Sequence, residues 1–567
     1  MSQTPPSLDE KSSEIDFKED PLTFTGKPLA TDSVESVRLS RFPWRNKKIN
    51  VDLDAIATQP SVFDDPEQAK FYEPRPDYEN IHRFDPSARW TWREEKAVVR
   101  KIDWKIMTWV AFMFFSLNID RGNLSQANTD NFLGDLGLST NDFNLGNTVF
   151  LVSFLCAEVP SQLVSKKLGP DRWIPSQMVL WSIVAGAQFF LTGKKSFLVT
   201  RALLGILQGG FIPDNVLYLS YFYNKAELPM RLAIFWVSDS VSGIVASFLA
   251  FGILHLRGVD GKEGWRWLFL IEGLLTFTIG LASFFMMPPS PTQTKAWFRP
   301  KGYFTEREEV IMVNRILRDD PSKGDMHNRQ ALTPKMLLRS LMDFDLWPIY
   351  AIGLTFQVPT EPPAVYFTLS LKHLGFNTFN INLLTIPVTV LGIFTLIFVS
   401  WTSEIFDERA IHGLLGQAWA LPFLIIEFLR AGTLSPWSQY AVIGLMLAQP
   451  YTHAIQVAWC SRLSNSVRTR TVSAATYNMF VQISNIIASN FYQYRADDAP
   501  LYRRGNAVLI GFTIMNCCIF AFSKVYYIMR NRWKARIWDA MTKEEQEHYL
   551  ATTTDEGNKK LNFRFEH

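Results

Sequence analysis

The sequence predicts an all-α membrane protein with twelve transmembrane helices arranged in two six-helix bundles. Apolar windows about 20 residues long, enough to cross roughly 30 Å of hydrocarbon, recur along the chain. The mean hydropathy of the 567-residue chain is +0.01 because charged ends and one charged middle segment offset these windows. The middle segment follows the sixth window, so it separates two sets of six.

The predicted spans lie at 104–124, 145–164, 173–192, 198–222, 232–255, 266–287, 346–370, 381–401, 410–429, 438–460, 471–493 and 506–529. The sequence therefore divides into five parts. We expect a cytoplasmic N-terminal tail over 1–101, an N-terminal six-helix bundle over 102–288, a cytoplasmic connector over 289–344, a C-terminal six-helix bundle over 345–529 and a cytoplasmic C-terminal tail over 530–567.

The two soluble segments before and between the bundles differ in character. Residues 1 to 88 are rich in Ser, Pro and charged residues and poor in aliphatics, which predicts disorder. Near 90–101, apolar and charged residues alternate with helical spacing, which predicts an interfacial helix with a tryptophan anchor, and the run contains Trp90 and Trp92. In the connector, Thr305 precedes three acidic residues within four positions, which predicts the start of a short amphipathic helix. We expect the connector, including this helix, to be a solvated linker that joins the two bundles; the alternative is a regulatory role.

Basic residues predict the orientation in the membrane. No Lys or Arg lies between Arg121 and Lys166, whereas basic residues follow the second and tenth spans and the last span. Because cytoplasmic loops carry an excess of Lys and Arg, the loop after the first span is predicted to be non-cytoplasmic. An even number of spans then leaves both termini in the cytoplasm. With no retention signal in the sequence, we expect a multi-pass protein of the plasma membrane.

The most informative local feature is the charged pair Asp120-Arg121, which follows the apolar run from Ile106 to Leu117. A charge at the centre of a membrane helix costs about 2.5–3.5 kcal/mol on insertion scales. Such residues mark routes for polar solutes or protons. The pair therefore indicates a pathway through the first bundle.

Several motifs resemble the major facilitator superfamily and, within it, the fungal allantoate-permease branch of the anion:cation symporters. They are Asn118-Ile119-Asp120-Arg121-Gly122-Asn123, Glu158-Val159-Pro160-Ser161, Arg201-Ala202-Leu203-Leu204-Gly205, and Gly264-Trp265-Arg266-Trp267-Leu268-Phe269 with Glu272-Gly273. The resemblance implies the twelve-helix major facilitator fold, with a substrate site between the two halves near the membrane midplane. It also implies proton-coupled uptake of a small organic anion by alternating access. The class includes carboxylates, ureides, vitamin acids and sulfonates.

Three residues of the first half match functional positions of the family. Arg121 and Arg201 match the two arginines that bind the acidic group of the substrate, and a guanidinium fits a carboxylate or sulfonate bidentately. The competing interpretation pairs Arg121 with its neighbour Asp120 and lets Arg201 reach the outer membrane surface. Asp120 matches the proton-coupling carboxylate, so its protonation would depend on whether an anion occupies Arg121.

Gln208 departs from the family pattern. Seven residues after the arginine of the fourth span, family members often have a glutamate that also handles protons, and an amide cannot titrate. Asp214 is a candidate substitute for proton coupling, although its spacing from Gln208 places it on a different face of the predicted helix. Asp239 in the fifth span is a weaker candidate.

The second half contributes polar candidates to the substrate site. Three prolines at 359, 362 and 363 predict that the seventh span is interrupted, and broken backbone at membrane depth is tolerated where it lines a cavity. His453 has an alternative interpretation as a hydrogen-bonded packing residue. The substrate-binding candidates of this half are Gln357, Glu361, Gln449, His453 and Asn478.

Other functions and partners are less consistent with the sequence. An anion exchanger or exporter of the same fold and a non-transporting nutrient sensor remain alternatives. We expect no enzyme, because the sequence has no P-loop, nucleophile elbow or paired-histidine metal motif. All four cysteines fall inside predicted spans, which indicates packing and not a disulfide or zinc site. We expect a monomer in the lipid bilayer that binds the anion and protons, without a cofactor, metal or nucleic acid.

Overall fold

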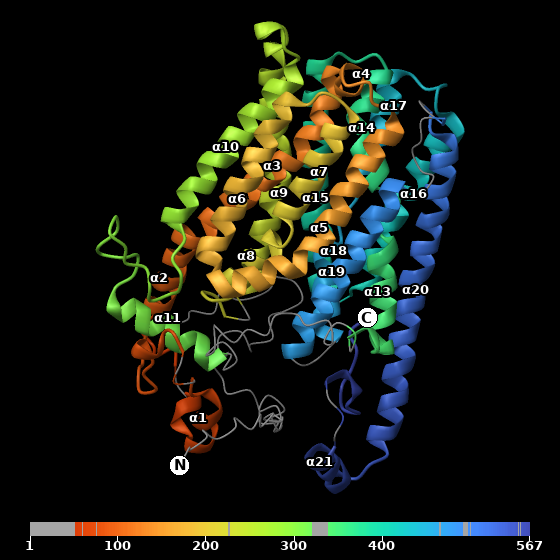
Figure 1. Cartoon of the computed structure of the whole chain (residues 1–567). Coiled ribbons are helices and arrows are strands. Elements are labelled where there is room, and N and C mark those ends of the chain that lie inside the picture. The colour runs from red at the N-terminus through yellow and green to blue at the C-terminus, as the bar shows by residue number, and fades with distance from the viewer. Residues whose placement is uncertain are drawn as a thin grey trace, which may run out of the picture.

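The computed structural model in Figure 1 describes residues 52–567 except 59–60, 75, 77, 225–226, 320–337, 339, 407, 464–466, 491–496, 499–500, 554 and 556. Residues 1–51 and 320–337 therefore lie outside the described residues, and the disorder predicted for the first of these segments stays a prediction. From residue 52 on, the segment predicted to be disordered contains the helix α1 (Pro66–Tyr72) and the buried Tyr78 and Asn80, so the prediction is wrong there. Within the described residues the chain is helical, and the only β pairings are two isolated bridges. The all-α prediction is confirmed.

Helices coincide with all twelve predicted spans. In the first half they are α3 (Thr108–Ala127), α5 (Thr140–Leu168), α6 (Pro170–Ala187), α7 (Lys194–Gln208) with α8 (Phe211–Leu219), α9 (Leu228–Ile253) and α10 (Gly264–Met286). In the second half they are α13 (Trp347–Thr355) with α14 (Glu361–His373), α15 (Thr378–Phe406), α16 (Ala410–Arg430), α17 (Pro436–Leu447) with α18 (His453–Leu463), α19 (Val467–Asn490) and α20 (Arg503–Asp539). Seven stretches of the described chain are long and apolar enough to cross a membrane, and one of them covers both α7 and α8.

Three spans are interrupted. The break between α13 and α14 confirms the interruption predicted from the prolines of the seventh span. The breaks in the fourth span, at Gly209 and Gly210, and in the tenth, after Leu447, were not expected from the sequence. Gly210 has a φ of +85°, a left-handed conformation that glycine adopts without steric cost. The fourth span is therefore two helices, and Asp214 belongs to the second of them.

The two halves are joined by hydrogen bonds at one end of the molecule. We call this the loop end because it carries α4 (Phe132–Asp135) and α17; the opposite tail end carries α1 (Pro66–Tyr72) and α21 (Lys543–Thr552) (Figure 1). Thr378 Oγ1 donates to the Thr129 carbonyl at 3.0 Å, and Tyr366 Oη donates to Asn144 Oδ1 at 2.5 Å. Deeper in the bundle, α9 packs against α15 and α5 against α19. These contacts hold the polar candidates of both halves near one another.

At the tail end, the connector helix packs against the segment before the first span. The predicted cap is confirmed, since α11 (Glu306–Asp319) begins after Thr305, whose Oγ1 accepts the Glu308 amide at 3.3 Å. The prediction of a solvated linker is wrong for this helix, because nine of its residues are buried. Lys101 Nζ, at the end of α2 (Trp92–Ile102), donates to Glu308 Oε2 at 2.7 Å.

Trp90 is not a lipid anchor. Its side chain is 2% exposed, its Nε1 donates to Glu95 Oε2 at 2.7 Å, and the Arg318 guanidinium lies 4.5 Å from the ring centroid. The predicted helix is present as α2, and of the two tryptophans at its start Trp90 packs against protein and cannot be the anchor. A tryptophan beside a membrane packs against protein whenever a second element covers it, and α11 supplies that element.

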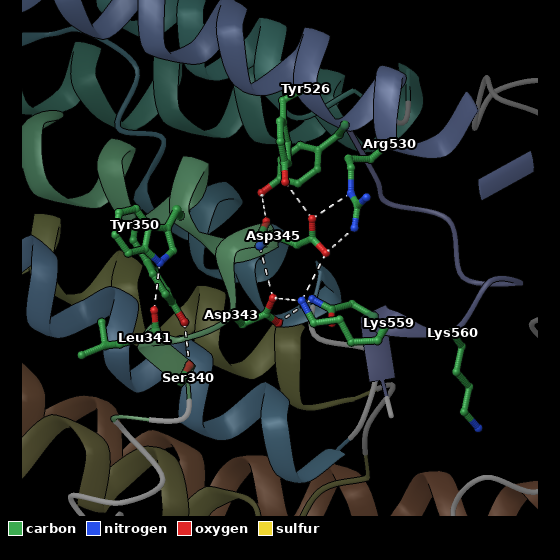
Figure 2. Close-up of polar contacts among 12 residues, drawn as sticks. Ser340, Leu341, Asp343, Asp345, Tyr350, Tyr526, Arg530, Lys559 and Lys560 are labelled. Carbon is green, nitrogen blue, oxygen red and sulfur yellow. Dashed lines mark hydrogen bonds and ion pairs between the residues drawn. The ribbon is translucent and has the colours of Figure 1, made fainter. Parts of the chain in front are cut away.

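The C-terminal helix is longer than predicted and the chain after it folds back. α20 continues to Asp539, ten residues past the predicted end of the span. Near its tail end, Arg530 Nε donates to Asp345 Oδ1 at 2.9 Å and Tyr526 Oη donates to the same oxygen at 2.7 Å (Figure 2). Lys559, beyond α21, contacts the other oxygen of Asp345 at 3.3 Å. The chain that follows α21 thus stabilises the tail end of the second half through Lys559.

Candidate functional site

Asp120 and Arg121 point to different neighbours. Oδ2 of Asp120 accepts a hydrogen bond from Trp181 Nε1 on α6 at 3.0 Å. Nε of Arg121 donates to Gln208 Oε1, the last residue of α7, at 3.1 Å. Successive residues on a helix are separated by about 100° of rotation, which directs the two side chains to different helices. The interpretation in which Arg121 pairs with Asp120 does not describe this geometry.

Arg201 lies beside Arg121 and against the same aromatic ring. The guanidinium carbon of Arg201 is 4.4 Å from the centroid of Phe150, and that of Arg121 is 5.8 Å from it. Arg201 is 6% exposed, so it does not reach the membrane surface, and one of its terminal nitrogens donates to Asn147 Oδ1 at 3.1 Å. Arg121 also lies 4.9 Å from the centroid of Phe154. Aromatic rings on this face of α5 thus form cation–π contacts with both guanidinium groups.

Close packing between α5 and α7 sets this arrangement. A Cβ atom on Gly205 would lie 2.4 Å from the carbonyl oxygen of Phe150, and one on Gly209 would lie 2.8 Å from that of Phe154. Only glycine permits the two backbones to approach so closely. Gly205 is one turn after Arg201, so the same approach brings the arginine onto the Phe150 ring.

The two guanidinium groups have no close counter-ion among the residues that the structure describes. No carboxylate oxygen of those residues lies within 4.0 Å of either group. The exposed Asp239 of α9 acts electrostatically on Arg121 without an ion pair, and the two arginines repel one another. Nε of Arg201 is buried without a hydrogen-bond partner, and the terminal nitrogens of Arg121 donate to no described residue. These N–H groups can bind a planar anion bidentately.

Residues of the seventh and tenth spans face this region from the second half. Gln357, in the break before α14, donates from Nε2 to Tyr451 Oη at 3.1 Å. Both Glu361, the first residue of α14, and Asp239 act electrostatically on that hydroxyl. Tyr451 is 36% exposed although it lies between charged groups of both halves. Tyr451 thus connects the first-half site to Gln357 and Glu361.

The remaining candidates of the second half do not take part in the contact between Gln357 and Tyr451. His453 is 6% exposed and is packed between the rings of Trp236 of α9 and Phe356, at 5.7 and 6.0 Å between centroids. Asn478 of α19 faces its ring. Gln449 lies in the break between α17 and α18, with a buried Oε1 that has no hydrogen-bond partner among the described residues. The surroundings of His453 match the packing interpretation.

Asp214 belongs to a different cluster. It is 1% exposed on α8, and Ser161 Oγ of α5 donates to its Oδ2 at 3.5 Å. The other acidic group that acts on it is Glu158, also on α5. Since neither arginine contacts Asp214, the geometry does not connect it directly with the site around Phe150.

Sequence reasoning missed the residues that organise the arginines. Phe150, Phe154 and Asn147 lie on one face of α5 at helical spacing, a pattern that membrane helices use for ordinary packing as well. Their role follows from which residues of α3 and α7 pack against that face. The glycines at 205 and 209, four residues apart, were the available signal, because small residues at this spacing permit close helix approach.

Comparisons with known proteins agree with this fold. A family model described as Major Facilitator Superfamily matches residues 110–489. An uncharacterized transporter of Saccharomyces cerevisiae is 46% identical over 542 residues, covering 94% of this chain and 98% of the relative. The major facilitator-type transporter hxnP of Emericella nidulans is 26% identical over 414 residues, covering 72% of this chain and 81% of the relative.

Two solved structures show the same architecture. A bacterial homolog of the human lysosomal transporter Spinster, inward-facing and unoccupied, gives a TM-score of 0.58 at 14% identity, covering 76% of this chain and 97% of its own. The xylose transporter XylE from E. coli, in a partially occluded inward-open conformation, gives a TM-score of 0.56 at 12% identity, covering 73% and 96%. At these identities the likeness concerns the fold.

Proposed function

Because the chain belongs to the major facilitator superfamily and is a membrane transporter, not an enzyme, we propose that it takes up a small organic anion together with protons. The anion is a carboxylate, ureide, vitamin acid or sulfonate, and transport proceeds by alternating access of a site between the two halves. This assignment corresponds to the fungal allantoate-permease branch of the anion:cation symporters.

One observation carries the choice of an anion: two neighbouring guanidinium groups, Arg121 and Arg201, contact the ring of Phe150 without a close carboxylate among the described residues. Two like charges held together inside a bundle repel one another, and a guanidinium stays protonated. A bound carboxylate or sulfonate removes this repulsion and supplies acceptors for the N–H groups left without partners. A cationic solute would increase the repulsion.

The second half is proposed to complete the site around the rest of the substrate. Gln357 and Glu361 reach it through Tyr451, and Gln449, His453 and Asn478 lie behind them. A ureide or acid with further polar groups would find amide and hydroxyl partners there. Movement of the second half relative to the first would make or break these contacts.

Proton coupling is proposed for energetic reasons. Importing a monovalent anion against about 100 mV, inside negative, costs roughly 2.3 kcal/mol, which one co-transported proton cancels. Asp120 is the proposed proton carrier because it is 2% exposed and next to Arg121 on α3. With Gln208 beside Arg121, the neighbouring helix offers no titratable group at that contact. Asp214 remains an alternative proton carrier.

The proposed setting is a plasma membrane, with the tail end in the cytoplasm. The basic residues that follow the second, tenth and twelfth spans support this orientation. Figure 1 places α1 and α21 at the same end, which agrees with an even number of spans. We further propose that the protein works as a monomer, with the anion, protons and the bilayer as its partners.

The test is uptake by cells that express the protein. Growth on single nitrogen, sulfur or carbon sources identifies a substrate, and competition with carboxylates, sulfonates and cationic amines then defines its charge. We expect competition by anions only. Arg121→Lys and Arg201→Lys should each raise KM about tenfold or more, because a lysine loses bidentate bonding worth about 1.5–3 kcal/mol. Arg430→Lys, at the exposed end of α16, is the control. Competition by amines would reject the proposal.

A further inference from the structure

A second acidic residue lies with Asp120 inside the first half. Asp120 of α3 is 2% exposed and Glu272 of α10 is 0% exposed, and the charge of Asp120 acts on Glu272 across the contact between the two helices. Trp181 donates to Oδ2 of Asp120. Oδ1 of Asp120 and both carboxyl oxygens of Glu272 have no hydrogen-bond partner among the described residues. Three buried acceptor oxygens thus lack a donor.

Two further buried polar groups are directed at these acids. Asn123 lies nearly one turn after Asp120 and faces Glu272, while Thr276 lies one turn after Glu272 and faces Asp120. They are 1% and 0% exposed, and Asn123 Nδ2 and Thr276 Oγ1 also have no hydrogen-bond partner in the described part of the chain. The facing surfaces of α3 and α10 therefore form a closed polar cluster within an apolar bundle.

The charges around the cluster do not neutralise it. The helices packed against α3 include α6, which contributes Trp181, and α9, whose Asp239 acts on Arg121. No Lys, Arg or His nitrogen of the described residues lies within 4.0 Å of Asp120 or Glu272. Arg121 follows Asp120 on α3 but donates to α7. Two ionised carboxylates confined together without a cation are strongly disfavoured, whereas a proton held between them removes one charge and supplies a donor.

We propose that Asp120 and Glu272 share one proton and together form the site that carries the coupled proton of transport. The inference rests on the proton-coupled function proposed above and adds Glu272 to it. The proton is bonded to an oxygen of one carboxyl and hydrogen-bonded to the other, which leaves the pair with one negative charge. On release the O–H bond breaks, the proton passes to water and the pair carries two negative charges. Movement of α3 against α10 separates the two carboxyls and triggers the release.

The test measures carboxyl protonation directly and needs no substrate. Infrared difference spectra of the full-length protein in lipid vesicles, recorded across pH, follow the carbonyl stretch of protonated carboxyl groups. The wild type should show this band at neutral pH. In Asp120→Asn and in Glu272→Gln the surviving carboxyl should titrate with its midpoint moved by about one pH unit or more, because its partner charge is gone. Glu427→Gln, a 6% exposed glutamate of α16, is the matched control and should leave the coupled band unchanged.

Three outcomes would overturn the proposal. The first is a wild-type spectrum without the carbonyl band at neutral pH. The second is that, in Asp120→Asn and in Glu272→Gln, the surviving carboxyl titrates at the wild-type midpoint. The third is saturable binding of ²²Na⁺ to the wild type that is lost in both variants. Glu272→Asp keeps a carboxyl and should retain the coupled titration, which separates loss of the pair from loss of folding. The band depends on the acids alone, so Arg121→Lys should leave it intact even where anion binding fails. Failure of the anion assignment and failure of the shared proton are thus distinguishable.

Discussion

Asp120 and Arg121 are consecutive on α3, yet one accepts a hydrogen bond from Trp181 on α6 and the other donates to Gln208 on α7. The positive and negative members of the pair therefore serve two separate sites. The arginine joins Arg201 on the Phe150 ring, and the aspartate faces Glu272. In the proposed mechanism, a rotation of α3 would change both sites at once and so couple the proton to the anion.

Gln208→Glu should weaken anion binding. The new carboxylate would occupy the position of Oε1, now 3.1 Å from Arg121 Nε, and would compete with the substrate for that guanidinium. A charge-assisted hydrogen bond contributes about 1.5–3 kcal/mol, so KM should rise about tenfold or more at neutral pH. Acidification should restore affinity as the glutamate becomes protonated. Uptake kinetics across pH measure this, and an unchanged KM at every pH would show that Gln208 does not control the arginine.

Phe150→Ala should loosen both arginines. Each guanidinium carbon lies within 6 Å of the ring, at 5.8 and 4.4 Å, and buried cation–π contacts contribute about 1–2 kcal/mol. We expect KM for the anion to rise roughly 5- to 30-fold, while Phe150→Tyr keeps the ring and the affinity. Phe112→Ala, which removes a 52% exposed ring of α3, is the control. Equal effects of the alanine changes at 150 and 112 would contradict a specific role for this ring.

Gly205→Ala should destabilise the first half. The added Cβ would lie 2.4 Å from the Phe150 carbonyl oxygen, and forcing the helices apart costs about 1–3 kcal/mol. A lower melting temperature of the purified protein and a weaker affinity for the anion should follow together, since the same contact positions Arg201. Gly243→Ala, where a Cβ would meet no atom within 4 Å, should be neutral or slightly stabilising. Tolerance of both changes would argue against close α5–α7 packing.

Asp345 should make the tail end sensitive to acid. Burial raises its pKa, but the hydrogen bonds from Arg530 and Tyr526 and the charge of Lys559 outweigh burial and hold the pKa below its usual range. A depressed folded-state pKa gives stability that is present above the unfolded value of about 3.9 and is lost as pH falls through the folded value. Asp345→Asn should therefore lower the free energy of unfolding at neutral pH by about 1–3 kcal/mol. This loss should appear as a lower melting temperature.

The pH dependence of that difference is the discriminating observation. The stabilities of wild type and Asp345→Asn should begin to converge as the pH falls below about 4 and should meet once it has passed through the lower pKa of the folded state. Asp539→Asn, at an exposed position of the same end, should have little effect at any pH. A constant difference between wild type and Asp345→Asn down to the lowest pH would mean that the charge of Asp345 contributes nothing.

The spans were predictable because the hydrocarbon thickness fixes the length of an apolar window. The seventh-span break was predictable too, since prolines remove backbone donors. The break at Gly209 and Gly210 was not, because glycine in a membrane helix serves helix packing as often as it interrupts the helix. Burial of Trp90 depends on α11, more than 200 residues later in the chain, and no local pattern carries that information.

The candidate site was only partly accessible from the sequence. Arg121 and Arg201 came from the family resemblance and from the rarity of charge in apolar spans. Their shared contact with Phe150 depends on how α3 and α7 pack against α5, which spacing along one helix does not specify. Glu272 entered the sequence analysis only as part of a family motif, and its position beside Asp120 emerged only from the packing of α10 on α3.

The central claim is that Arg121 and Arg201 recognise a negative charge. The most direct test is equilibrium binding to the purified protein of the acid selected by growth and of its uncharged amide, which has nearly the same shape. We predict that the wild type binds the acid at least about 100-fold more tightly than the amide, as expected for a site built around charge-assisted bonds, and that a protein carrying Arg121→Lys with Arg201→Lys loses this preference. Equal binding of the acid and the amide by the wild type would contradict the account.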